Sequence, residues 1–355
     1  MKKSVSFFLV SVFLSALITS CTKSEDVLES TTLKQTISES ASNLNNAMDA
    51  ISSSKAYTIL TISDGTQKDA SITDSTYRVY IPLDSIKGVY DYQPVTEFNT
   101  WGTPLIKFFT QTEDNNQMVV NMPVEKVENP RTLRHSLPED SLLTNNFSIA
   151  VSAYHNNYNS YHDFDYILAS EISIDDLAVG NLNIDYFVSP TDGIQYASEF
   201  AFNGSYAAKY NYQSGDTTVS SFAIQDADVV LYKEELLTIK NDTAWFGSER
   251  QYSLTIGDVQ IIRKPGTLEV EVYVNGVLQP NAVVVIIDNE FDAEASVCKK
   301  RDIQITFEDG TTTTVSALIG ESIANIKTLF ESLHQVYFAA YVVDWIAYDI
   351  YYQRN

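Results

Sequence analysis

Apolar side chains between residues 31 and 54 recur every three or four positions, the spacing of one face of an α-helix. The stripe consists of Leu33, Ile37, Ala41, Leu44, Met48 and Ile51. Serine, asparagine, aspartate and glutamate fill the other side. The pattern predicts an amphipathic helix over 31–54 that docks through this stripe.

From residue 56 to residue 315 the period changes to two, and tyrosine, valine, isoleucine, phenylalanine and threonine become frequent. Tight-turn sequences separate many of these runs, among them Asn203-Gly204, Gly215-Asp216, Asn275-Gly276 and Asp309-Gly310. Short connections between strands favour antiparallel pairing. We therefore expect a mainly β protein of the α+β class, with a large antiparallel meander forming a curved sheet or a sandwich.

The segment 121–145 interrupts this regular pattern. It carries Pro123, Pro130 and Pro138 among polar residues. Because proline donates no hydrogen bond to a β-ladder, we predict an irregular seam here, next to the regular meander.

A second helical stripe covers residues 316–352 and consists of Ile319, Ile323, Ile326, Phe330, Leu333, Tyr337 and Ala340. From Val336 onward apolar residues surround the helix axis, so we expect this half to be buried against the sheet. Asp344 and Asp349 interrupt it, which argues against a transmembrane span. A buried Asp344 must be paired with a base or protonated at a raised pKa, either as a structural group or as a functional acid.

The first residues have the pattern of an export signal. Lys2 and Lys3 precede the apolar run VSFFLVSVFLSALI, which is too short to cross a bilayer, and Leu17-Ile18-Thr19-Ser20 stands directly before Cys21. This arrangement resembles the lipobox of bacterial lipoproteins. The resemblance implies that residues 1–20 are a cleaved signal peptide, that Cys21 carries the lipid anchor, and that 21–30 form a tether. Two or three acyl chains would hold the protein on a membrane durably.

The sequence TKSED, residues 22–26, looks like the acidic tag that sends lipoproteins of Bacteroidetes-type bacteria to the outside of the outer membrane. A plain solvated tether would have a similar composition. Five Asp-Ser/Thr triplets also resemble the O-glycosylation acceptors of those bacteria, and modified hydroxyls would have to be exposed. The candidate acceptors are Ser75, Ser85, Ser141, Thr217 and Thr243.

The composition narrows the set of partners. With a net charge of −23, the chain is a poor ligand for nucleic acid. The 44% of apolar residues is enough for a large core, which argues against disorder.

If Cys21 is acylated, Cys298 has no partner for an intramolecular disulfide. Cys298 precedes Lys299, Lys300 and Arg301, so it is either a packed structural thiol or one with a lowered pKa.

Signatures of common catalytic sites are missing from the sequence. It contains no HExxH, GxSxG or GxxxxGK motif, and its four histidines are His135, His155, His162 and His334. We therefore expect neither an enzyme nor a cofactor, although a hydrolase assembled from distant residues stays open.

The stretch YHNNYNSYHDFDY, residues 154–166, is the strongest candidate for ligand binding. Tyrosine rings stack on sugar faces, and asparagine and aspartate hydrogen-bond hydroxyl groups, so a loop of this composition suits glycan contact. The candidate residues are Tyr154, His155, Asn156, Asn157, Tyr158, Tyr161, His162 and Asp163. Two other interpretations stay open: a metal site on His155, His162 and Asp163, or a polar hairpin loop at the sheet edge.

A run of acidic residues at alternate positions forms a weaker candidate, for Ca²⁺. It consists of Asp288, Glu290, Asp292 and Glu294. Ala293 and Lys299 stand where an EF-hand loop has glycine and glutamate, so a solvated acidic loop is the favoured interpretation.

These observations lead to three functional hypotheses. The first is a lipid-anchored outer-membrane protein, exposed on the cell surface, with a non-catalytic binding or adhesion role towards a glycan or an envelope protein. The second is a periplasm-facing carrier of a hydrophobic ligand or lipoprotein, by analogy with carriers in which a helix lies over a curved sheet. The third is an unrecognised hydrolase.

Overall fold

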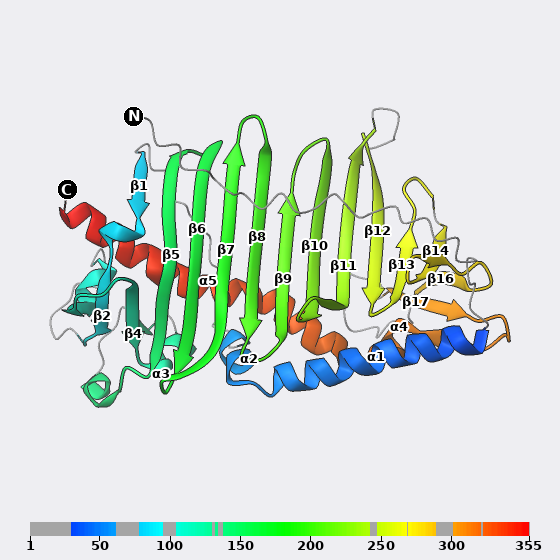
Figure 1. Cartoon of the computed structure of the whole chain (residues 1–355), viewed down its shortest axis with the longest axis horizontal. Coiled ribbons are helices and arrows are strands. Elements are labelled where there is room, and N and C mark those ends of the chain that lie inside the picture. Colours follow the sequence, from blue (N-terminus) through cyan, green and yellow to red (C-terminus); the bar gives the residue numbers. More distant parts are fainter. Residues whose placement is uncertain are drawn as a thin grey trace, which may run out of the picture.

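The computed structural model describes residues 30–61, 78–94, 104–129, 132–133, 138–241, 247–267, 269–288, 301–320 and 322–354. Half of the protein is strand and 28% is helical, which confirms the expected mainly β class. One sheet of 15 strands forms the body, a separate sheet of three strands stands at one end, and helices lie along the lower edge and on one face (Figure 1).

Eight long strands form an antiparallel meander at the centre of the sheet, as predicted. They are β5 (Phe147–Ser160), β6 (Asp163–Ile174), β7 (Leu177–Ser189), β8 (Gly193–Phe202), β9 (Tyr206–Gln213), β10 (Thr217–Asp226), β11 (Val229–Lys240) and β12 (Ser248–Ile256). Strands β13 (Val259–Arg263), β14 (Val270–Val274) and β15 (Val277–Leu278) continue it to one edge. Strands β16 (Val283–Asp288), β17 (Arg301–Thr306) and β18 (Thr312–Thr314) form the small sheet.

The opposite edge departs from a pure meander. Strands β2 (Gly88–Tyr92) and β4 (Met118–Met122) are parallel, and β3 (Phe109–Glu113) pairs with β2 at the edge. Strands β1 (Val79–Pro82) and β4 pair with different halves of β5. The sheet is therefore mixed.

Helix α1 (Ser30–Ser52) corresponds to the first predicted helix, and its apolar stripe is buried. It contacts β11, β12, β13 and the two last helices. The turn between β12 and β13 approaches it closely, since a Cβ at Gly257 would lie 2.7 Å from Ser40 Oγ. A second short helix, α2 (Lys55–Leu60), follows at the start of the region that we assigned to the β body. Its N-terminus is capped by Ser54 Oγ, which accepts from Tyr57 N, and Ala56 and Leu60 are buried, so capping and burial outweigh the β-branched composition.

The predicted seam at 121–145 contains α3 (Val124–Glu128) and the 3₁₀ helix η4 (Pro138–Leu142). Lys126 Nζ lies 2.7 Å from Asp140 Oδ2, and both side chains are almost completely buried. The segment connects β4 to β5, which pair directly in the main sheet. Two other 3₁₀ turns, η1 (Leu83–Ser85) and η2 (Leu105–Phe108), flank β2 and β3.

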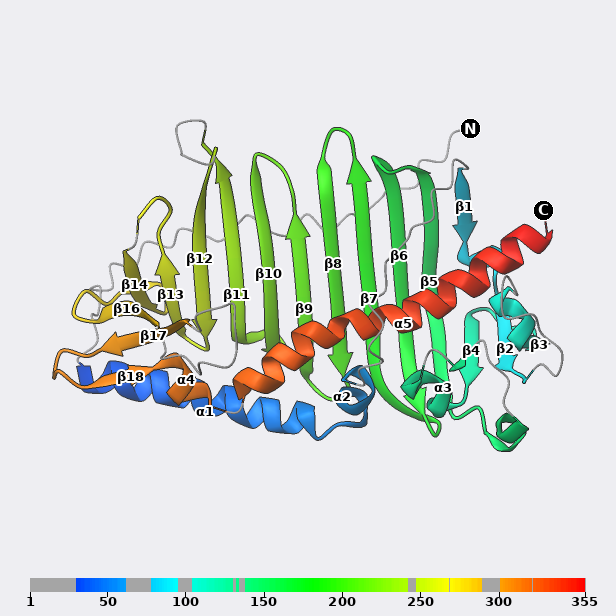
Figure 2. The same ribbon diagram turned by 180° about the vertical axis from the view of Figure 1, so that it is seen from behind.

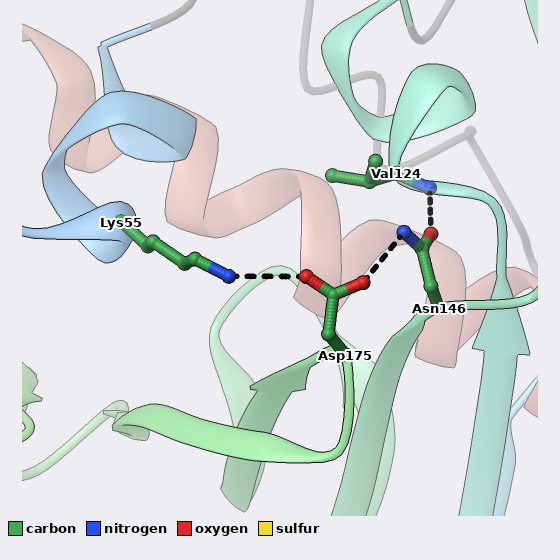
Figure 3. Close-up of polar contacts among 4 residues, drawn as sticks. All are labelled: Lys55, Val124, Asn146 and Asp175. Carbon is green, nitrogen blue, oxygen red and sulfur yellow. Dashed lines mark hydrogen bonds and ion pairs between the residues drawn. The ribbon is translucent and has the colours of Figure 1, made fainter.

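A polar cluster joins α2, α3 and the β6–β7 turn at the lower end of the sheet (Figure 3). Lys55 Nζ lies 3.0 Å from Asp175 Oδ2, and Asn146 Nδ2 donates to Asp175 Oδ1 at 3.1 Å. Asn146 Oδ1 in turn accepts from Val124 N. The hydrogen bonds from Lys55 and Asn146 lower the pKa of Asp175. The cluster links the starts of α2 and α3 to the turn between β6 and β7.

The predicted C-terminal helix is divided in two. Helix α4 (Val315–Ile319) ends at Gly320, whose φ of +41° favours glycine, and α5 (Ser322–Arg354) follows. Figure 2 shows α5 crossing one face of the sheet obliquely. Phe330 contacts the rings of Tyr210 on β9 and Phe222 on β10, and Asp349 accepts from Ile106 N beyond β5.

No described helix or strand covers the opposite face between β5 and β12 (Figure 1). We call this side the open face and the α5 side the covered face. Within the described ranges, every helix falls short of the combined length and hydrophobicity that crossing a membrane requires.

Candidate functional site

The predicted binding stretch 154–166 does not form a loop. Strand β5 continues to Ser160, β6 begins at Asp163, and only Tyr161 and His162 form the turn between them. Pairing with β6 over this whole length satisfies the backbone groups, which outweighs the low strand propensity of asparagine.

Strand alternation separates the predicted residues onto two faces. Tyr154, Asn156 and Tyr158 are buried on the covered face. His155 and Asn157 point to the open face between them. Tyr161, His162 and Asp163 are exposed at the turn. The structure therefore does not bring the eight predicted residues together in one place.

A different group of polar residues gathers on the open face around His155. Its Nε2 lies 2.7 Å from Asp165 Oδ2, and both side chains are about one-third exposed. His155 and Asp185 are register partners of Ile167 on its two sides, so the three polar residues span adjacent strands β5, β6 and β7.

The electrostatics of this group are set by its two carboxylates. Partial burial raises the pKa of Asp185, the charge on Asp165 raises it further, and His155 opposes both effects. Protonation of Asp185 therefore becomes easier as Asp165 becomes charged. The group can accept several hydrogen bonds, and its imidazole can donate or accept.

Two aromatic residues flank the same group. Cross-strand partners form one continuous row from Tyr80 through Asn157 and Asp165 to Phe187. Tyr80 is 57% exposed, and its ring centroid lies 6.5 Å from that of His155. We call Tyr80, His155, Asn157, Asp165, Asp185 and Phe187 the open-face site. It presents planar polar groups between two rings on a sheet face that no described helix or strand covers.

Of these six residues, the composition of 154–166 indicated His155 and Asn157 but not the other four. Asp165, Asp185 and Phe187 lie at open-face positions of strands whose alternation is visible in the sequence. Their proximity depends on strand register, however, which the sequence does not display.

The covered face holds a second polar group beneath α5. The Asp344 side chain is largely enclosed between α5 and the sheet, and Tyr154 Oη donates to its Oδ1 at 2.9 Å. Burial raises the pKa of Asp344 to about 7, although hydrogen bonds from Tyr154 and Tyr166 act in the opposite direction. Of the two expectations for this residue, a raised pKa is the one that the structure supports. Its neighbour Asn156 has an Oδ1 atom without a hydrogen-bond partner among the described residues.

The remaining predicted sites are partly described. Ser141 and Thr217 are exposed, whereas Ser85 is half-buried and donates to Pro82 O at 2.8 Å. Cys21, Ser75, Thr243, Glu290, Asp292, Glu294 and Cys298 lie outside the described residues, and of Asp288 only the backbone is described, at the end of β16. Among the described side chains, no group of three or more histidine, cysteine or acidic residues is arranged to hold a metal ion.

The interface between α5 and the sheet is closely packed. Val342, Val343, Ile346 and Ala347 on the inner side of α5 are all fully buried. A pocket of about 230 Å³ lies at the sheet edge instead, between Tyr90 and Phe109 on one side and Ile350 and Gln353 on the other.

Comparison of the chain with models of protein families, with curated proteins and with solved structures found no match in any of the three.

Proposed function

We propose that this chain is a lipid-anchored protein of the bacterial outer membrane, facing outward, whose open-face site binds a glycan without catalysis. The observation that carries the binding role is the row of Tyr80, Asn157, Asp165 and Phe187 on the open face, with His155 paired with Asp165 beside it. The proposal of a lipid anchor is based on the apolar signal and the lipobox-like residues before Cys21.

The chemistry of the open-face site suits a polyhydroxylated ligand. Carboxylate, amide and imidazole groups make paired hydrogen bonds to neighbouring hydroxyls, and exposed rings pack on the apolar faces of sugars. The half-buried His155–Asp165 contact holds both groups in place before a ligand arrives, which lowers the ordering cost of binding.

The charge of the site narrows the class of glycan. Two carboxylates face a single imidazole, and the whole chain carries −23. An anionic polysaccharide would meet like charges. We therefore expect neutral glycans to bind better than uronic-acid polymers.

Affinity electrophoresis of the purified protein in gels containing starch, xylan, mucin or polygalacturonate tests the binding role. The variant Asp165→Ala/Asn157→Ala should migrate freely where the unmodified protein is retarded. Gln251→Ala is the matched control, because Gln251 lies on β12 in the same cross-strand row but far along the sheet. Equal retardation of all three proteins, or of none in any gel, would contradict the proposal.

The anchor is tested separately by growing cells with radiolabelled palmitate. Cys21→Ala should remove the label and release the protein from membranes. External protease should cleave the unmodified protein on intact cells, and protection until the cells are permeabilised would contradict the outward orientation.

A further inference from the structure

Two turns of the described chain contain asparagine followed directly by glycine. Asn203-Gly204 lies between β8 and β9, and Asn275-Gly276 joins β14 to β15. All four residues are exposed, and no atom lies within 4 Å of a Cβ built on either glycine. Such a pair favours spontaneous deamidation, because a glycine nitrogen without a neighbouring side chain can approach the asparagine amide. Sequence and exposure therefore do not distinguish the two turns.

The reaction converts the asparagine amide to a carboxylate in two steps. The backbone nitrogen of the glycine loses its proton and attacks Cγ of the asparagine. A bond forms between that nitrogen and Cγ, the bond from Cγ to Nδ2 breaks, and the proton leaves with ammonia. Water then opens the cyclic imide at one of its two carbonyls. Opening at Cγ gives aspartate, whereas opening at the backbone carbonyl gives isoaspartate, in which the main chain runs through the side chain.

The two asparagine side chains are held differently. Asn203 Nδ2 donates to Ala178 O at 2.9 Å, and this hydrogen bond must break before Cγ can turn towards Gly204 N. The side chain of Asn275 makes no hydrogen bond to any residue that the structure describes. Its backbone N donates to Asp258 O at 3.0 Å, which leaves the amide group itself unrestrained.

The strands around the two turns also differ. Strands β8 and β9 have ten and eight residues and lie in the middle of the sheet (Figure 1). Strand β15 has two residues and is the last strand at its edge of the sheet. Asn275 and Gly276 have φ of +50° and +81°, so the turn has to open before Gly276 N can reach Cγ. A two-residue edge strand opens more readily than two long central strands.

We infer that Asn275 deamidates in the folded protein through opening of the β14–β15 hairpin, whereas Asn203 is protected. The product adds a negative charge to the turn, and isoaspartate also adds a methylene group to the main chain. The extra methylene does not fit the two-residue connection between the paired residues Val274 and Val277, so β15 should detach from β14. The inference depends neither on the proposed anchor nor on the open-face site.

Peptide mapping by mass spectrometry tests this inference on the purified full-length protein, kept folded at mildly alkaline pH. Aspartate and isoaspartate should accumulate several-fold faster at Asn275 than at Asn203. Equal rates at the two positions, or a faster reaction at Asn203, would overturn the inference.

The same measurement in concentrated urea separates structure from sequence. The two rates should become similar in the unfolded chain, since glycine follows both Asn203 and Asn275. A several-fold difference that persists in urea would assign the preference to the sequence around Asn275 and would overturn the structural inference.

Two variants test the opening step. Val277→Gly weakens β15, so it should speed the reaction at Asn275 and leave Asn203, the internal control for global unfolding, unchanged. Asn275→Gln keeps an amide in the turn but requires a larger ring for closure, so the peptide should remain unconverted over the same period. A rate at Asn275 that Val277→Gly leaves unchanged would overturn the inference, because hairpin opening would then not control the reaction.

Discussion

The two faces of the central sheet differ although the same strands build both. On the covered face, Tyr154, Tyr166 and Leu168 are buried beneath α5. On the open face, the intervening positions hold His155, Asp165 and other polar groups that stay partly exposed. Core and candidate site therefore alternate residue by residue. A register slip of one position would exchange them, so the burial of one face also fixes the geometry of the other.

The largest expected effect is a difference in stability between two asparagine variants on opposite faces of β6. Leu168→Asn buries an unpaired amide and leaves a cavity under α5, so it should lower the free energy of unfolding by about 4 kcal/mol. Ile167→Asn, one position away on the open face, should cost about 1 kcal/mol or less. Urea denaturation of both variants measures the difference, and equal losses would show that the open face is covered in solution.

The next effect is a pH dependence that originates on the covered face. The pKa of Asp344 is about 7 in the folded protein, above its value of about 4 in the unfolded chain, so the folded state binds more protons between these limits. The contribution of Asp344 to the free energy of unfolding should therefore be greatest below about pH 4. It should decline by about 2–4 kcal/mol up to pH 7 and then level off.

Asp344→Asn should flatten this part of the stability profile, since the amide does not titrate. Asp185→Asn on the open face is the matched control and should change the profile less, because Asp185 keeps contact with water. Chemical denaturation at a series of pH values from 4 to 8 provides the measurement. An unchanged slope in Asp344→Asn would refute the assignment.

Two further variants should have smaller effects: one should weaken binding but not stability, and the other should lower stability but not affect binding. Asp165→Asn should weaken glycan binding about tenfold while changing the free energy of unfolding by less than about 1 kcal/mol. Tyr154→Phe removes the hydrogen bond to Asp344, so it should cost about 1–2 kcal/mol and leave binding unchanged. Affinity electrophoresis and urea denaturation of both variants test this, and a loss of binding in Tyr154→Phe alone would move the site to the covered face.

The smallest effect should come from the polar cluster at the lower end of the sheet. Lys55 and Asp175 are both more than half exposed, so solvent and salt screen their attraction. Lys55→Gln should lower Tm by at most about one degree, and the decrease should vanish at high salt. A large decrease would mean that this cluster, and not the packing of α5, determines stability.

The sequence predicted the architecture well because each element has a long periodic pattern. The stripe from Leu33 to Ile51 and the alternation from β5 to β12 both specify buried faces through many residues. Shorter features were predicted less well, since α2 depends on one cap at Ser54 and the division at Gly320 on a single dihedral angle.

The candidate site was harder to predict for a different reason. The stretch 154–166 attracted attention by composition, yet its Tyr154, Asn156, Tyr158 and Tyr166 are buried on the covered face. The partners of His155 come from β6 and β7, and only the pairing register places them beside it. Alternation alone would have separated Tyr154 from His155, which is the signal that composition obscured.

The order of elements along the chain has a consequence for export. Every described strand precedes α5, so in the export that we propose the apolar face that α5 covers stays unprotected until this last helix has crossed the inner membrane. During that interval the sheet exposes a large apolar surface that can aggregate with other chains. We therefore expect periplasmic chaperones to attend the unfinished chain, and quality-control proteases to remove copies whose final helix fails to dock.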